Sequence, residues 1–93
     1  MIYCVYLILS KKSDKYRSYV GYTNNISNRL YLHNNSKGAK FTRGRKWILA
    51  YCKRYISKSV AMREEYKLKK NIKLRNKIKL KFKKNENFNI TPL

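Results

Sequence analysis

The chain has 93 residues, which is enough for one domain with a small core but not for two. It carries 24 lysine and arginine residues against 4 aspartate and glutamate residues, a formal net charge of +20. This excess predicts a polyanion partner, preferably nucleic acid, over a merely solvated basic surface. No stretch approaches the ~20 apolar residues of a membrane span, and the apolar start lacks the basic segment of a signal peptide. We therefore expect no membrane partner and an intracellular location: cytoplasm or nucleoid, nucleus, or a host cell for a viral protein.

Two short segments at the start of the chain predict an antiparallel hairpin. Residues 2–9 form a continuous apolar run, typical of a strand covered on both faces. Residues 10–17 are polar and predict a long loop, and residues 18–23 predict the second strand. The two strands carry Tyr6 and Tyr19. Tyrosine is first of all a favoured packing residue of strands, but a phenol beside cations can have its pKa lowered and act as a base.

A first helix is predicted over residues 26–34, with Asn25 as its N-cap. Arg29 and His33 lie one helical turn apart and project from the same side of this helix. Each has two interpretations. Arg29 is either an ordinary surface cation or a group that contacts phosphate. His33 is either a cation near the helix C-terminus or a group that moves protons near neutral pH.

A basic loop with two glycines is predicted over residues 37–47. Lysine and arginine in such a loop can hold a nucleic-acid backbone while an aromatic side chain stacks on a base or anchors the loop. For Trp47 we favour anchoring by packing on the domain. The candidate nucleic-acid contacts in the loop are Lys40, Thr42, Arg43, Arg45 and Lys46.

The second half of the chain predicts a third strand and two helices. The strand covers residues 48–55, and a helix capped by Ser57 covers residues 58–70. Between residues 72 and 82 the apolar spacing fits both a strand and a helix, and we favour a helix. We expect one domain over residues 1–84, with residues 71–84 as a basic extension and residues 85–93 as a frayed tail.

Two cysteines, Cys4 and Cys52, lie in apolar, strand-like contexts. Reduced thiols in the core of an intracellular protein are the preferred interpretation, and a disulfide is the alternative. With a single histidine and two distant cysteines, the sequence has no zinc-site spacing.

Helix phase distinguishes the two glutamates of the second predicted helix. Ala61, Glu65 and Leu68 fall at i, i+4 and i+7 and share one face, so Glu65 lies within the apolar stripe. A carboxylate there is costly unless it pairs with a cation or binds a metal ion, and both alternatives stay open. Glu64 falls on another side and is expected to be solvated. With so few acidic residues, a site for one metal ion fits better than a two-metal nuclease centre.

Several motifs in this order resemble the GIY-YIG nuclease family, in particular its small stand-alone members and the nuclease domains of UvrC and of Holliday-junction resolvases. The resemblance covers residues 1 to about 70. Cys4-Val5-Tyr6 stands in place of Gly-Ile-Tyr, and Tyr19-Val20-Gly21 in place of Tyr-Ile-Gly. The remaining matches are Gly21-Tyr22-Thr23 through Arg29-Leu30, His33-Asn34, the run from Gly38 to Arg45, and Ala61-Met62-Arg63-Glu64-Glu65 with Leu68-Lys69-Lys70.

The resemblance implies an α+β fold, a three-stranded antiparallel sheet flanked by helices in the order β-β-α-β-α, with a further C-terminal helix. It also implies a metal-dependent endonuclease that leaves 5′-phosphate and 3′-hydroxyl ends on DNA. Glu65 would hold one Mg²⁺ or Mn²⁺ ion, and Tyr6 would be the general base. His33 and Tyr19 would assist by hydrogen bonding, and Arg29 would stabilise the transition-state charge.

Two positions depart from the pattern of the family. Cys4 replaces a glycine. Some members also have an asparagine after the metal-binding glutamate, and no residue after Glu65 clearly matches it, although Asn71 and Asn76 are candidates. We expect a role in DNA repair, recombination or genome processing, possible action on branched or flapped DNA, and a possible protein partner that confers specificity. The alternatives are a non-catalytic basic module that binds nucleic acid and a catalytic subunit that depends on such a partner.

Overall fold

The computed structural model describes residues 1–13 and 15–90, with side chains described up to residue 84. The elements, in chain order, are β1 (Tyr3–Lys12), β2 (Lys15–Thr23), α1 (Ile26–Asn34), the short 3₁₀ helix η1 (Lys40–Thr42), β3 (Ile48–Tyr55), α2 (Lys58–Lys70) and α3 (Ile72–Ile90). The strands form one antiparallel sheet in the order β2-β1-β3. The predicted α+β class and the order of elements are therefore confirmed.

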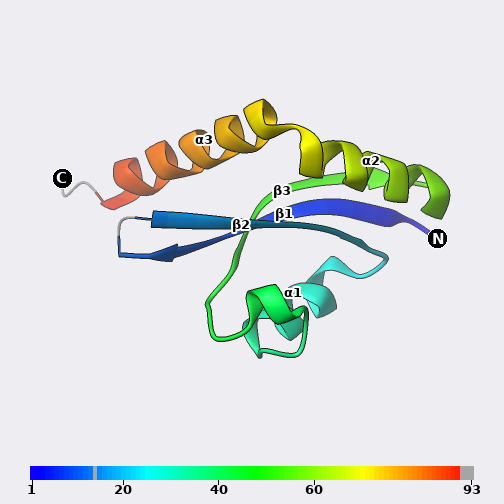
Figure 1. Cartoon of the computed structure of the whole chain (residues 1–93), viewed down its shortest axis with the longest axis horizontal. Helices are drawn as coiled ribbons and strands as arrows, with labels where there is room; N and C mark the ends of the chain where they lie inside the picture. The colour runs from blue at the N-terminus through cyan, green and yellow to red at the C-terminus, as the bar shows by residue number, and fades with distance from the viewer. Residues whose placement is uncertain (14, 91–93) are drawn as a thin grey trace.

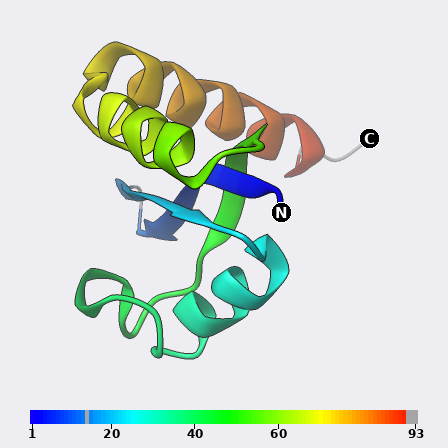
Figure 2. The same cartoon turned by 90° about the vertical axis from the view of Figure 1, so that its right-hand side faces the viewer.

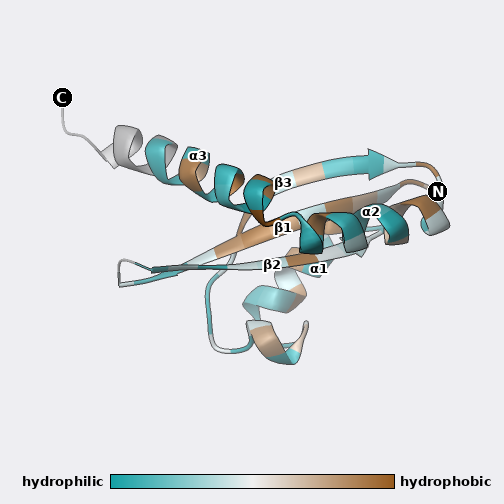
Figure 3. Cartoon of the chain, turned by 45° about the horizontal axis from the view of Figure 1, so that its top comes forward, coloured by the Kyte–Doolittle hydropathy of each residue, from teal (hydrophilic) through white to brown (hydrophobic). Residues whose placement is uncertain are grey.

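Three layers make up the domain, with the sheet in the middle. Helices α2 and α3 cover one face, and α1 with the loop that contains η1 covers the other (Figures 1 and 2). Strand β1 lies between its two partners, and every residue from Cys4 to Ser10 is buried. Figure 3 shows this central strand as largely hydrophobic, whereas the helices are mostly hydrophilic. A strand covered on both faces needs apolar residues on both, which is why residues 2–9 lack polar alternation.

The sheet separates the apolar core into two clusters. On the side of α2 and α3 the buried members are Val5, Leu7, Leu9, Val20, Ala61 and Leu68. On the side of α1 the buried members are Tyr6, Ile8 and Trp47, with Tyr19, Ile26, Leu30 and Leu49 packed against them. Successive residues of a strand point to opposite faces, so Tyr6 and Tyr19 lie on the α1 side while Val5 and Val20 lie on the α2 side. This alternation decides which residues can reach the histidine of α1.

The hairpin is longer than the sequence predicted. Residues 10–17 were expected to form a loop, but the two strands stay paired as far as Lys12 opposite Lys15. Ser13, in the turn, has a positive φ of 58°. Ser10 is buried in spite of its polarity. The long hairpin supports α3, since the rings of Tyr16 and Phe82 meet edge to face with their centroids 6.3 Å apart.

Both predicted helix caps are confirmed. The Asn25 side chain accepts a hydrogen bond from the Asn28 amide, and the Ser57 hydroxyl accepts one from the Val60 amide. Such caps satisfy amide groups that the first helical turn leaves unpaired. The bounds of α1, β3 and α2 agree with the predicted ranges.

Helix α3 resolves the conflicting pattern beyond residue 71. Leu74, Ile78 and Phe82 pack against the core cluster on the α2 side of the sheet, as the helical spacing predicted. The helix continues to Ile90, so residues 85–90 are helical and not part of a frayed tail; residues 91–93 lie outside the described residues. None of the helices within the described residues combines the length and the apolar composition needed to span a membrane.

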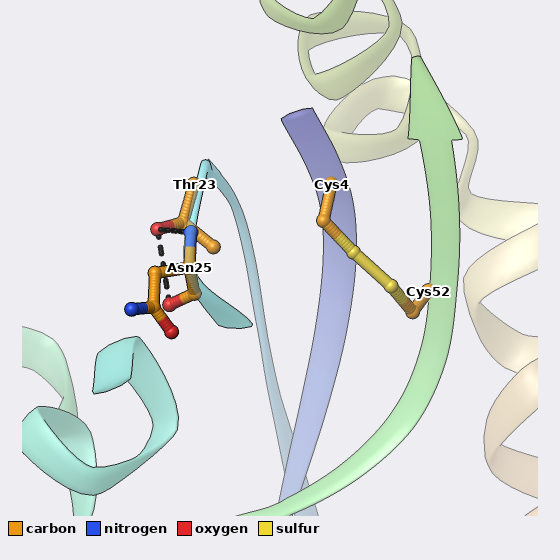
Figure 4. The surroundings of a disulfide bond; sticks show 4 residues. All are labelled: Cys4, Thr23, Asn25 and Cys52. Atoms are coloured by element: carbon orange, nitrogen blue, oxygen red, sulfur yellow. Dashed lines mark hydrogen bonds between the residues drawn. A yellow bond between two sulfur atoms is a disulfide. The ribbon is translucent and has the colours of Figure 1, made fainter. Parts of the chain in front are cut away.

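The two cysteines form a disulfide, contrary to the preferred interpretation of reduced thiols. Cys4 on β1 and Cys52 on β3 are bonded, with their Cα atoms 6.2 Å apart (Figure 4). Cys4 lies opposite Arg54 and Cys52 opposite Tyr6, so the cysteines are diagonal neighbours on one face of the sheet. This Cα separation falls within the usual range for a disulfide, and the sequence alone did not provide the strand register that creates it.

Candidate active site

A chain of hydrogen bonds links Tyr6 to the loop through His33. His33 and Thr42 are 0% exposed, and Tyr6 is also buried. The Tyr6 hydroxyl lies 2.9 Å from His33 Nε2, and His33 Nδ1 lies 2.9 Å from the Thr42 hydroxyl oxygen. Thr42 donates its own proton to the Ala39 carbonyl and accepts a hydrogen bond from the Ala39 amide. His33 is therefore part of a buried polar network and is not an exposed cation at the helix end.

The surroundings of Thr42 decide which nitrogen of His33 carries the proton. Because the single Thr42 proton goes to the Ala39 carbonyl, the hydroxyl oxygen can only accept from His33 Nδ1. The pattern thus assigns the proton to Nδ1 and leaves Nε2 as the acceptor for the Tyr6 hydroxyl. Burial, and next the charge of Arg29, lower the pKa of His33 to about 4. At neutral pH the imidazole is therefore neutral, and its Nε2 lone pair is free to accept the hydrogen bond from the Tyr6 hydroxyl.

Tyr6 does not have the lowered pKa that a phenol beside cations can show. Burial raises the pKa of Tyr6 above its usual value. The Arg29 guanidinium opposes this rise by hydrogen bonding and by its charge, whereas Tyr19 and Glu65 add to it. Removal of water outweighs the single nearby cation, because a phenolate loses more hydration than Arg29 replaces. A basic role for Tyr6 therefore requires an acceptor for its proton, and His33 Nε2 occupies that position.

Two glycines make room for this network. A Cβ atom on Gly21 would lie 2.5 Å from the Tyr6 hydroxyl, and a Cβ atom on Gly38 would collide with His33 Nδ1. Gly21 is the residue opposite Tyr6 across the β1–β2 pair. The last residue of the Tyr19-Val20-Gly21 motif therefore lets the phenol of the neighbouring strand cross over the backbone of β2 toward α1.

The expected carboxylate and guanidinium line one hollow at the β2 edge of the sheet. A hollow of about 510 Å³ is lined by Tyr3, Tyr19, Tyr22, Thr23, Asn24, Arg29, Lys58 and Glu65. Arg29 comes from the helix on one face of the sheet and Glu65 from a helix on the other face. Strand β2 has no neighbour on its outer side, so groups from both layers can converge there. The beginning of α1 is fixed beside this hollow by the Thr23 hydroxyl, which accepts a hydrogen bond from the Asn25 amide (Figure 4).

The position of Glu65 is compatible with both roles that helix phase left open, an ion pair with a cation and a bond to a metal ion. Its side chain is 17% exposed and forms an ion pair with Lys69 at 3.2 Å. The same carboxylate lines the hollow with Arg29 and Tyr19. Within the described residues no group of three or more histidine, cysteine, aspartate or glutamate side chains gathers to hold a metal ion. Mg²⁺ is nonetheless commonly held by one carboxylate together with waters and substrate phosphates, and one carboxylate is what this hollow offers.

The basic loop divides into exposed cations and a buried anchor. Lys40, Arg43 and Lys46 are exposed and remain candidate phosphate contacts. Arg45 is partly buried and donates hydrogen bonds to Ser10 at the far end of β1, where it lines a second basic hollow. The expectation for Thr42 was wrong: its side chain is fully buried and orients His33, so it is closed to a phosphate.

Trp47 anchors the loop, as expected. It is buried, and its indole N–H donates to the Thr42 carbonyl at 2.8 Å. The Asn34 side chain holds the same residue from α1 by accepting from the Trp47 amide at 2.5 Å and donating to the Trp47 carbonyl. Asn71, a candidate for the late asparagine, instead caps α3 by accepting from the Leu74 amide. It lines a different hollow from Glu65.

Sequence reasoning missed three features of this region: the orienting role of Thr42, the contact of Gly38 with His33, and Phe41. The Phe41 ring stacks on the Tyr19 ring, with their centroids 6.1 Å apart and their planes at 26°. The only signal in the sequence for the contact of Gly38 with His33 was a glycine five residues after a histidine. The roles of Thr42 and Phe41 depend on the turn of η1, which directs Thr42 inward and leaves Phe41 exposed.

The buried, neutral state of His33 predicts how stability depends on pH. In the unfolded chain a histidine has a pKa of about 6.5, whereas in the folded chain the pKa of His33 is about 4. We expect its contribution to be fully present above pH 6.5 and to be lost as the pH falls toward 4, with a slope of at most about 1.4 kcal/mol per pH unit. Urea unfolding across this range measures the slope. In His33→Gln the slope should be smaller by this contribution; equal slopes in both proteins would contradict this origin.

Comparison with known proteins identifies the group to which these residues correspond. A family model described as the GIY-YIG catalytic domain matches residues 2–86. This range includes most of α3, which the motifs alone had left outside the resemblance. Most of helix α3 therefore falls within the range that the family model matches.

Similar proteins occur in several microorganisms. The UPF0213 protein OB0043 of Oceanobacillus iheyensis is 54% identical over 52 residues, which are 55% of this chain and 60% of that protein's length. The UPF0213 protein SH2523 of Staphylococcus haemolyticus is 42% identical over 66 residues, 70% of this chain and 77% of that protein. The solution NMR structure of the UPF0213 protein BH0048 from Bacillus halodurans is 36% identical, with a TM-score of 0.46 and coverage of 89% of this chain and 86% of that one.

Proposed function

The chain belongs to the GIY-YIG nuclease family, and we propose that it is a metal-dependent endonuclease that hydrolyses DNA phosphodiester bonds to 5′-phosphate and 3′-hydroxyl ends. The observation that carries this proposal is the convergence of Arg29, Tyr19 and Glu65 on one hollow beside the buried Tyr6–His33 pair. A domain that only binds phosphate gains nothing from a carboxylate in its binding hollow. The excess of basic residues supports a nucleic-acid substrate.

Tyr6 and His33 are proposed to move the proton of the attacking water. The water gives its proton to the Tyr6 oxygen as the Tyr6 hydroxyl proton passes to His33 Nε2. Nε2 can take this proton because the Thr42 hydroxyl keeps the other proton on Nδ1, and the low pKa of His33 means that the imidazolium exists only transiently and gives the proton back after cleavage. Tyr19 contacts the imidazole from the side, with ring centroids 5.0 Å apart, and supports its orientation.

Arg29 is proposed to stabilise the charge that develops on the scissile phosphate. It lines the hollow and interacts with Tyr6, so a phosphate bound in the hollow contacts the guanidinium close to the phenol. A fixed cation at the position where negative charge increases lowers the barrier, since it need not reorganise during the reaction. Lys58 lines the same hollow and can add to the binding of the phosphate.

Glu65 is proposed to hold one Mg²⁺ or Mn²⁺ ion, which supplies Lewis-acid assistance to the leaving oxygen. Its present partner is Lys69, so the carboxylate must exchange an ion pair with lysine for a metal ligand. With one carboxylate and several lysines nearby, metal binding should be weak until the phosphates of the substrate contribute further ligands. The role of the protein in DNA repair, recombination or genome processing, and any partner that directs it, belong to the same proposal.

The test is cleavage of supercoiled plasmid, linear duplex, flap and four-way junction DNA. We expect cuts with Mg²⁺ or Mn²⁺, no cuts with EDTA, and products that a DNA ligase can rejoin because they carry 5′-phosphate and 3′-hydroxyl ends. A protein that binds all four substrates and cuts none under any metal condition would instead be a basic binding module. In that case Glu65 would serve only as the partner of Lys69.

A further inference from the structure

We infer that Phe41, with Tyr19 and Arg17, forms a stacking platform for an unpaired DNA base beside the proposed cleavage centre. This inference rests on the proposed function and deepens it, because it names single-stranded or flapped DNA as the substrate class. Phe41 is 49% exposed, although its neighbour in the chain, Thr42, belongs to the buried network. Phe41 has no part in the proposed cleavage steps.

A series of aromatic rings extends from the proton relay, which is the buried Tyr6–His33 pair, to the surface of the protein. His33 contacts Tyr19, and Tyr19 stacks on Phe41. The Arg17 guanidinium lies over the Phe41 ring, 5.0 Å from its centroid. Tyr19 is partly buried, whereas Phe41 and Arg17 are exposed, so a flat ligand can reach only the outer end of this series.

The hollow beside the platform is basic. A space of about 330 Å³ is lined by Ser18, Tyr19, Val20, Phe41, Lys69 and Arg75, with no acidic residue among them. Arg75 makes a long contact of 3.5 Å to the Ser18 hydroxyl, and its Nε atom is buried without a hydrogen-bond partner in the described part of the chain. Because Nε is buried, it is closed to a ligand, and only the part of the Arg75 side chain that lines the hollow can contact a phosphate.

Tyr19 belongs to both hollows, the one with Arg29 and Glu65 and the one with Phe41 and Arg75. A strand that places one phosphate beside Arg29 therefore brings a neighbouring nucleotide over Phe41. The base would take the place of Arg17 above the ring, and the exposed guanidinium would turn to a phosphate or cover the base from outside. Bases inside a duplex are already stacked and paired, so only an unpaired nucleotide can use this platform.

The experiment measures binding in EDTA, so that it does not depend on cleavage. A single-stranded oligonucleotide with 2-aminopurine at successive positions is titrated with the wild type, and stacking quenches the fluorescence at one or two of those positions. In Phe41→Leu we expect the quenching to be lost and the affinity for the single strand to fall about tenfold, with affinity for a blunt duplex unchanged. Phe41→Tyr keeps the aromatic ring, so we expect it to keep both the fluorescence quenching and the affinity for the single strand.

Tyr66→Leu is the matched control. Tyr66 is an exposed aromatic residue with Lys70 over its ring at 5.0 Å, but it lines neither hollow. Its replacement should leave single-strand binding unchanged. Equal weakening of single-strand and duplex binding by Phe41→Leu, or no weakening, would overturn the platform. If the protein cuts no DNA but 2-aminopurine is quenched in a Phe41-dependent manner, the nuclease proposal fails and the platform stands.

Discussion

Replacement of Arg29 by alanine, or of Glu65 by glutamine, is expected to lower the rate of DNA cleavage at least about 10²-fold while leaving the fold intact. Both side chains line the hollow at the β2 edge, and neither belongs to the buried apolar clusters. Removal of the guanidinium takes away the cation facing the scissile phosphate. Removal of the Glu65 charge takes away the proposed metal ligand. Single-turnover cleavage of the preferred substrate, with metal and substrate saturating, measures the loss.

Glu64→Gln is a close control for Glu65→Gln. Glu64 is the preceding residue on the same helix and also pairs with a lysine, Lys67, at 3.2 Å. Its side chain is 30% exposed and lines a hollow on the other side of the helix. We expect near wild-type cleavage in Glu64→Gln. Equal losses in both variants would mean that the general charge of α2, and not a metal site at Glu65, supports activity.

Two further measurements separate chemistry from binding in these variants. Arg29→Lys keeps the positive charge but loses the planar guanidinium, so we expect it to recover only part of the activity. Glu65→Gln should bind DNA in EDTA as well as the wild type or better, because it loses a negative charge near the substrate. A Glu65→Gln protein whose DNA affinity falls together with its cleavage rate would argue against a metal-binding role.

Gly21→Ala is expected to have the second largest effect. The new methyl group would lie 2.5 Å from the Tyr6 hydroxyl, so the phenol must move. Tyr6 is almost fully buried and holds a hydrogen bond to His33, and it therefore cannot move without loss of that bond. We expect cleavage to fall about 10²-fold or more, with a loss of about 1–3 kcal/mol in the free energy of unfolding from overpacking. Urea unfolding and cleavage assays measure the two effects.

Gly44→Ala distinguishes this steric effect from a general intolerance of glycine replacement. Gly44 has a positive φ of 74°, but a Cβ atom there would meet nothing within 4 Å. Alanine should cost about 1–2 kcal/mol of backbone strain and leave the proton relay intact. Gly38→Ala, which displaces His33 from the other side, should resemble Gly21→Ala. A Gly21→Ala enzyme as active as Gly44→Ala would exclude Tyr6 from the reaction.

The sequence predicted the elements well where local signals agreed. Asn25 and Ser57 are side chains that cap helices, and both helices begin immediately after them. The hairpin was less predictable. Residues 10–17 are polar and lack an apolar alternation, so only pairing across the strands, with α3 packed above, shows that both strands continue to the turn. The disulfide was missed for a related reason, because the diagonal placement of Cys4 and Cys52 depends on the register of β1 and β3.

The sequence alone determined the chemistry available to this protein: a strongly basic chain, a tyrosine on each of two strands, an arginine and a histidine one turn apart, and a glutamate within an apolar stripe. Periodicity and capping are local properties, so they could be read without coordinates. The tertiary structure alone decided how these groups meet, because their contacts cross layers of the sheet. It buried Thr42 against His33, let Tyr6 cross over Gly21, and brought Glu65 from one face to Arg29 on the other around the edge of β2.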